Sequence, residues 1–157
     1  MRSRRRVLLA AGLLVLAGGL YLVLTWLARA MLYPGDPTPL PERVALDDAR
    51  VAERVEYRAQ DGALLRGLWL APRAQAPVVV YFHGNAESAA QQADVLGALG
   101  EGGRGVLLAE YRGYGGCAGS PTEAGLYADA EGALGEIGRR GVGLERVILV
   151  GRSLGTG

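Results

Sequence analysis

The residues Gly151, Ser153 and Gly155 form a G-x-S-x-G pattern directly after the apolar run VILV (147–150). A serine hydroxyl can attack a carbonyl carbon when a neighbouring base takes its proton. In a nucleophile elbow, a tight strand-to-helix turn holds this serine in a strained backbone conformation, and glycines flank it because a side chain would collide with a neighbouring element. The N–H of Leu154 would then point to where an oxyanion forms. The pattern predicts acyl transfer through Ser153.

The same glycines allow a second interpretation. Gly151, Gly155 and Gly157 also spell G-x-x-x-G-x-G after a strand. This spacing is similar to the dinucleotide loop of short-chain dehydrogenases, in which N–H groups at a helix N-terminus hold a pyrophosphate. That loop follows the first strand of its fold, whereas several predicted strands come earlier here, which disfavours this interpretation.

A second motif, His83-Gly84-Asn85, follows the apolar run PVVVYF (77–82). In hydrolases with a nucleophile elbow, a turn of this kind supplies the other amide of the oxyanion hole. We therefore expect the N–H of Asn85 to act together with the N–H of Leu154. His83 is the only histidine in the sequence, and we expect it to brace the loop through hydrogen bonds and not to act as the catalytic base.

These motifs need strands to position them, and the apolar pattern supplies them. Short continuous apolar runs are typical of strands buried on both faces, and a strand pair around Asp61-Gly62 has the signal of a hairpin turn. The residues Ser120-Pro121-Thr122-Glu123 resemble a capping box with Ser120 as N-cap. The predicted strands are 52–59, 64–72, 77–82, 105–111 and 147–150, and the predicted helices are 88–99 and 120–139, with Asp94 and Asp129 as solvated helix positions.

This order, a β-hairpin followed by β-α-β-α-β, predicts an α/β fold with a mostly parallel sheet. An apolar segment precedes it. Residues 7–28 carry no charge, and a helix of that length reaches about 33 Å, enough for a bilayer core of roughly 30 Å. We therefore predict a basic tip and transmembrane anchor over 1–30, a proline-rich linker over 31–43, and a partial hydrolase domain over 44–157.

Charge and aromatic residues suggest how the anchor is oriented. Four arginines lie in the first six residues, and Tyr21 and Trp26 lie toward the far end of the apolar segment. The positive-inside rule then places the N-terminus in the cytoplasm and residues 44–157 outside, in the periplasm or the extracellular space. The alternative is a secreted protein whose signal peptide is cleaved near Ala30, since Ala28-Arg29-Ala30 resembles a cleavage site.

Composition excludes several partners. From residue 31 onward, twelve arginines face sixteen acidic residues, a net charge of −4, so nothing points to nucleic acid. One cysteine and one histidine cannot build a Cys/His metal site. We expect no metal and no organic cofactor.

Three segments together resemble the α/β-hydrolase superfamily: VVVYFHGNAES (78–88), YRGYGGCAGSPTEAGLYADAEGAL (111–134) and VILVGRSLGTG (147–157). The nearest group is the membrane-anchored "alpha/beta hydrolase domain" proteins often labelled serine aminopeptidase-like. The resemblance implies an eight-stranded sheet, a Ser–Asp–His triad and ester, thioester or amide substrates, either small molecules or acylated ones. It makes Ser153 the nucleophile, gives the oxyanion hole to Asn85 and Leu154, and leaves Cys117 as a small loop residue.

In this fold the triad acid and histidine follow the elbow in the chain. The sequence ends four residues after Ser153, so we expect it to be a nearly inactive fragment in which residues 147–150 form an open apolar sheet edge. We expect the intact parent to be a membrane-anchored serine hydrolase. The alternative is a non-catalytic, membrane-tethered relative or the product of a pseudogene.

Overall fold

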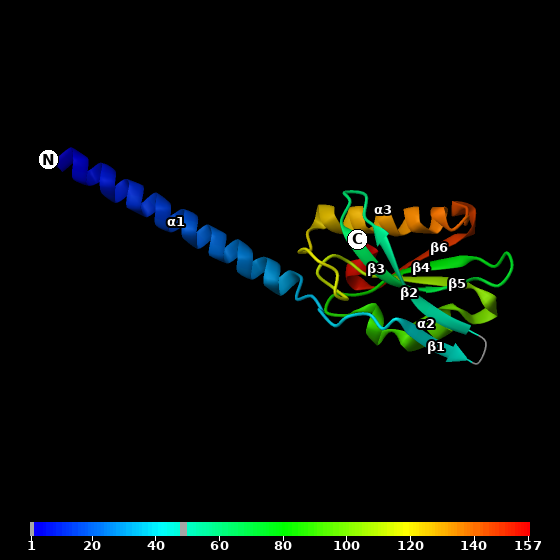
Figure 1. Ribbon diagram of the computed structural model, residues 1–157. Helices are drawn as coiled ribbons and strands as arrows, with labels where there is room; N and C mark the ends of the chain where they lie inside the picture. The colour runs from blue at the N-terminus through cyan, green and yellow to red at the C-terminus, as the bar shows by residue number, and fades with distance from the viewer. Residues whose placement is uncertain (1, 48–49) are drawn as a thin grey trace. The chain divides into compact units, whose positions relative to one another are not determined.

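The computed structural model describes residues 2–47 and 50–157, in two units, Met1–Pro34 and Gly35–Gly157. The first unit is dominated by one helix, α1 (Arg2–Leu32) (Figure 1). Its segment Arg6–Leu32 is long and apolar enough to cross a membrane, a property that a signal sequence shares. The helix extends four residues beyond the predicted apolar segment.

The second unit contains a mixed sheet of six strands among the described residues, in the order β1-β2-β3-β5-β4-β6. The pairs β1–β2, β2–β3 and β3–β5 are antiparallel, whereas β4 pairs in parallel with both β5 and β6. The α/β class is confirmed, and the parallel part is confined to three strands because β3 joins β5 in antiparallel fashion. The strands are β1 (Arg43–Asp47), β2 (Arg50–Arg58), β3 (Leu64–Leu70), β4 (Val78–Phe82), β5 (Gly105–Ala109) and β6 (Val147–Gly151).

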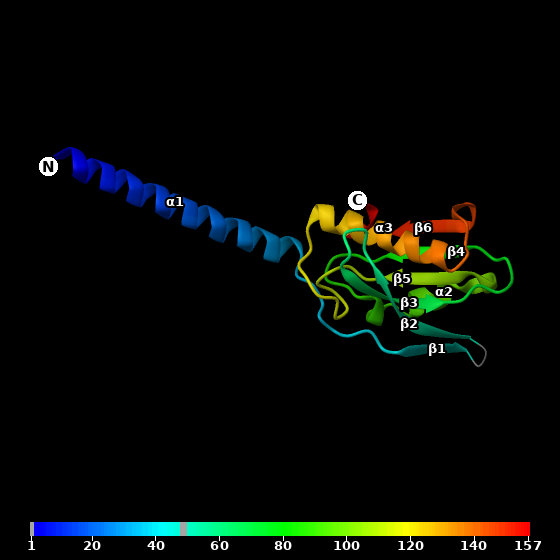
Figure 2. The same cartoon turned by 45° about the horizontal axis from the view of Figure 1, so that its top comes forward.

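Two helices cover opposite faces of this sheet (Figures 1 and 2). On β4, Val78, Val80 and Phe82 pack in one cluster with Ala133 and Ile137 of α3 (Glu123–Arg139). The alternate β4 residues, Val79 and Tyr81, pack in the other cluster with Leu96 of α2 (Ala93–Leu99). Every residue of β4 and β5 is buried, as the continuous apolar runs predicted.

The helix starts differ from the predictions. The N-cap of α3 is Thr122, whose Oγ1 accepts a hydrogen bond from the N–H of Gly125 at 3.1 Å. Ser120 as N-cap was wrong, because α3 begins only at Glu123 and Thr122, directly before it, has the extended backbone of an N-cap. The helix predicted from residue 88 begins as a 3₁₀ turn over Ala89–Gln91, and α2 starts only at Ala93.

Strand β6 was predicted to be buried on both faces, and this was wrong. It lies at the edge of the sheet, hydrogen-bonded to β4, with Ile148 43% and Leu149 59% exposed. Val147 and Val150 of this strand are partly buried against the two core clusters, so the exposed apolar surface is that of Ile148 and Leu149. The expected open apolar edge is therefore confirmed.

Candidate active site

Ser153 lies in the tight turn that the glycine pattern predicted. Its φ is +49°, in the left-handed region that is costly for residues other than glycine. A Cβ on Gly151 would collide with the carbonyl of Gly155, and a Cβ on Gly155 would collide with the carbonyl of Phe82. The backbone at Ser153 is therefore strained, and neither glycine position has room for a side chain. The turn continues as the 3₁₀ helix η4 (Ser153–Thr156), which leaves Ser153 exposed.

The loop that follows β4 lies directly beside this turn. The N–H of Arg152 donates to the carbonyl oxygen of Phe82 at 3.0 Å. The side chain of Arg152 forms an ion pair with Glu87 at 2.8 Å. These two contacts join the ends of the segment that contains Gly84 and Asn85 to Arg152, the residue before Ser153.

His83, the first residue of this loop, is 1% exposed and both its ring nitrogens have partners. Nδ1 lies 2.8 Å from the carbonyl oxygen of Gly84, and Nε2 lies 3.0 Å from Oε2 of Glu110. A carbonyl oxygen can only accept, so Nδ1 is the donor there. The other oxygen of Glu110 accepts from the N–H of Ala89 at 2.6 Å. Both ring nitrogens therefore take part in hydrogen bonds that stabilise the loop after β4.

A buried tyrosine contacts the side chain of Asn85. Tyr114 is 0% exposed, and its hydroxyl donates to Oδ1 of Asn85 at 2.7 Å. The same oxygen accepts the N–H of Ala86 at 3.0 Å, and Ala86 has a left-handed φ of +56°. The hydroxyl thus stabilises a turn with an uncommon backbone conformation.

We predict that Tyr114→Phe lowers the free energy of unfolding by about 1 kcal/mol, because Oδ1 of Asn85 loses the hydrogen bond from the tyrosine hydroxyl while the ring packing remains. Tyr57→Phe is the matched control. Tyr57 is also buried, but its hydroxyl is without a hydrogen-bond partner in the described structure. Removing that hydroxyl is expected to leave stability unchanged or raised. Urea unfolding of both variants measures the difference, and equal losses in the two would contradict the role given to Tyr114.

Asp129 was predicted to be a solvated helix position, and this was wrong. It is 1% exposed, and its Oδ1 lies 2.6 Å from Nη2 of Arg112. The backbone N–H of Arg112 also donates to Asp129, and its guanidinium reaches Asp61 at 2.7 Å. These carboxylates raise the pKa of Arg112 and keep it charged. The network ties the loop after β5 to α3 and to the β2–β3 turn.

Cys117, expected to be a small loop residue, is 7% exposed within the same loop. Burial raises the pKa of its thiol to about 11. Since the thiolate is the nucleophilic form, such a thiol is poorly suited to attack a substrate near neutral pH.

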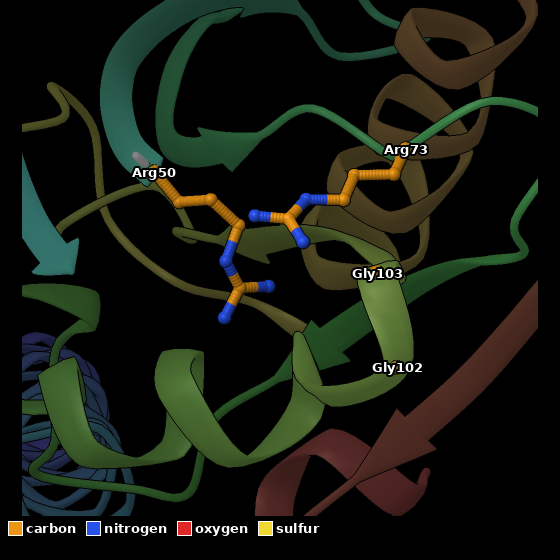
Figure 3. A pocket seen from close by; sticks show the side chains of 4 residues that line it. All are labelled: Arg50, Arg73, Gly102 and Gly103. Atoms are coloured by element: carbon orange, nitrogen blue, oxygen red, sulfur yellow. The ribbon is translucent and has the colours of Figure 1, made fainter. Parts of the chain in front are cut away.

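A hollow lined by Arg50, Arg73, Gly102 and Gly103 lies elsewhere (Figure 3). Arg73 precedes β4 and the glycines precede β5, so it is at the end of the sheet where the parallel strands begin, opposite to the end that leads into His83 and Ser153. Arg50 donates to the carbonyl of Gly100, just past the last residue of α2, at 2.6 Å. Arginine there complements the carbonyl end of a helix, which gives this residue a structural role.

Three neighbours of the predicted site were missed in the sequence: Glu87, Glu110 and Tyr114. Glu110 directly follows the apolar run of β5. A carboxylate at the end of a buried strand predicts a hydrogen-bond or ionic partner, because an unpaired buried charge is costly. Glu87 and Tyr114 carried no comparable signal, because their contacts join segments far apart in the chain.

Solved structures give the class of this fold. The Pyrococcus furiosus esterase Pf2001 superposes with a TM-score of 0.61, over 77% of this chain and 47% of its own, at 20% sequence identity. The "Alpha/beta hydrolase domain-containing protein WAV2" of Arabidopsis thaliana is 28% identical over 109 residues, covering 67% of this chain and 35% of that protein. Together with the order of the sheet, these likenesses show that the chain has part of the α/β-hydrolase fold.

A bacterial relative is similar over a longer stretch. The uncharacterized protein YfhR of Escherichia coli K12 is 32% identical over 150 residues, which cover 91% of this chain and 50% of YfhR. The chain thus spans about half the length of the curated relatives it matches over most of its length. No family model matches the sequence.

Proposed function

We propose that the whole protein is a serine hydrolase of ester, thioester or amide bonds with Ser153 as its nucleophile. The observation that carries this proposal is the left-handed φ of +49° at Ser153, enforced between two glycines whose Cβ positions are blocked. Strain of this kind persists where the surrounding structure holds it, and it clusters at active sites. The esterase Pf2001 shares the fold.

In the proposed reaction, Ser153 Oγ bonds to the substrate carbonyl carbon while a base takes its proton. The N–H groups of Asn85 and Leu154 stabilise the resulting oxyanion. The tetrahedral intermediate expels the leaving group, which takes up the proton, and water then hydrolyses the acyl-serine by the same steps. His83 is committed to Gly84 and Glu110, so we propose that the base and its acid partner come from elsewhere in the whole protein. No metal or organic cofactor has a step in this mechanism.

A fluorophosphonate probe tests the assignment, since it labels activated serines covalently. The whole protein is expected to label, and Ser153→Ala is expected to remove the label. Equal labelling of the variant would refute the assignment. A wild-type protein that does not label would favour the alternative, a non-catalytic, membrane-tethered relative of the superfamily.

We further propose that α1 anchors the protein in the bilayer, with its arginine-rich end in the cytoplasm and residues 44–157 outside. The support is the length and apolar character of Arg6–Leu32. The protein is expected to stay with the membrane after extraction with alkaline carbonate. Release as a shorter soluble product that begins near residue 31 would instead establish the cleaved signal peptide.

A further inference from the structure

Glu87 contacts both segments of the proposed oxyanion hole. Its Oε2 accepts the N–H of Gly84 at 3.1 Å, directly before Asn85 in the chain. Its Oε1 lies 2.8 Å from Nη1 of Arg152, which precedes Ser153 and Leu154. One carboxylate thus joins the loop after β4 to the elbow after β6.

The local backbone is shaped for this reach. Ala86, at φ +56°, turns the chain back so that residue 87 can meet residue 84. A Cβ on Gly84 would lie 3.3 Å from the carboxyl carbon of Glu87, tighter than an ordinary van der Waals contact. The carboxylate of Glu87 therefore lies close against Gly84, and a side chain there would require it to shift by a few tenths of an ångström.

Charge is compensated at the same place. The side chain of Glu87 is 20% exposed and that of Arg152 is 62% exposed. An isolated carboxylate beside a developing oxyanion would raise the energy of that oxyanion. The guanidinium of Arg152 neutralises Glu87, so the carboxylate can organise the loop amide without this penalty.

We propose that Glu87 is a positioning residue, which fixes the Asn85 and Leu154 amides relative to each other by holding Gly84 and Arg152 together. This inference rests on the proposed function. Oxyanion donors act through pre-arranged geometry, and loss of one donor costs about 10²- to 10³-fold in kcat. Loosening two donors without removing either is expected to cost less, about 10- to 100-fold.

The test is steady-state hydrolysis of p-nitrophenyl acetate by the whole protein. Glu87→Ala is expected to lower kcat about 10- to 100-fold with little change in KM, because ground-state binding does not use the oxyanion donors. Glu87→Gln keeps an oxygen that can accept from Gly84 and is expected to recover most of that loss. Affinity for a trifluoromethyl ketone, which forms a tetrahedral oxyanion adduct, is expected to fall in Glu87→Ala by the same factor as kcat/KM.

Two further variants separate positioning from general stability. The double variant Glu87→Ala/Arg152→Ala is expected to be no slower than Glu87→Ala alone, since both changes remove the same link. Glu53→Ala removes a comparable carboxylate–arginine pair, Arg43–Glu53 at 3.0 Å, on the far edge of the sheet, and is expected to leave kcat unchanged.

The outcomes distinguish this inference from the proposed function. Ser153-dependent labelling together with a wild-type kcat in Glu87→Ala would overturn the role of Glu87 and leave the nucleophile in place. Independent, multiplicative effects of Glu87→Ala and Arg152→Ala would also overturn it. Labelling that does not depend on Ser153 would overturn the proposed function itself.

Discussion

Replacing Ser153 by alanine is expected to lower kcat for an activated ester in the whole protein by about 10⁶-fold, the loss found when the nucleophile of a catalytic triad is removed. The reason is that no acyl-enzyme can form, while the oxyanion donors and substrate binding persist. KM is expected to change little, because the groups that bind the substrate are unchanged. The measurement is the rate of p-nitrophenol release under conditions where background hydrolysis is subtracted.

Ser120→Ala is the control for this change, because Ser120 is exposed in the loop before α3 and outside the proposed mechanism. It is expected to retain wild-type kcat. A Ser153→Ala variant that keeps even a tenth of the wild-type rate, in a preparation free of other esterases, would place the nucleophile elsewhere.

Replacing Asp129 by alanine is expected to lower the free energy of unfolding by about 3–5 kcal/mol. The change leaves the guanidinium of Arg112, 13% exposed, without its buried partner, and it also orphans the backbone N–H that donates to Asp129 at 2.9 Å. Domains of this size have a total stability of only about 5–15 kcal/mol. Urea unfolding followed by circular dichroism is expected to show a large shift of the midpoint.

Asp61→Ala is the matched control, since Asp61 contacts the same guanidinium from the solvent side. Arg112 holds the pKa of Asp61 below its usual value, but exposure to water weakens such a pair. Its loss is expected to move the midpoint far less. Equal shifts for the two aspartates would show that burial of Asp129 does not set the strength of this network.

The parts of the fold that the sequence predicted well are those governed by local pattern. The runs that became β4 and β5 are continuously apolar because both of their faces are covered, one by α3 and the other by α2. The elbow was predictable because steric exclusion at Gly151 and Gly155 acts on residue types directly.

The parts that were missed depend on contacts between distant segments. Strand β1 has a mixed pattern, RVALD, and becomes a strand by pairing with β2. The sequence around Asp129 does not distinguish it from a solvated acidic residue. Its burial is explained by its ion pair with Arg112, which lies in the loop after β5. The position of Glu87 likewise depends on its ion pair with Arg152, which follows strand β6 and is distant in the chain.

The two backbone approaches at the elbow also restrict how this pentapeptide can vary. Larger residues at 151 or 155 would collide with the backbone that meets them there, and Arg152 is paired with Glu87, so few positions of G-R-S-L-G are open to change. Differences in what such a protein recognises are therefore expected on the surrounding loops, and a laboratory library aimed at new selectivity gains little from randomising the motif itself.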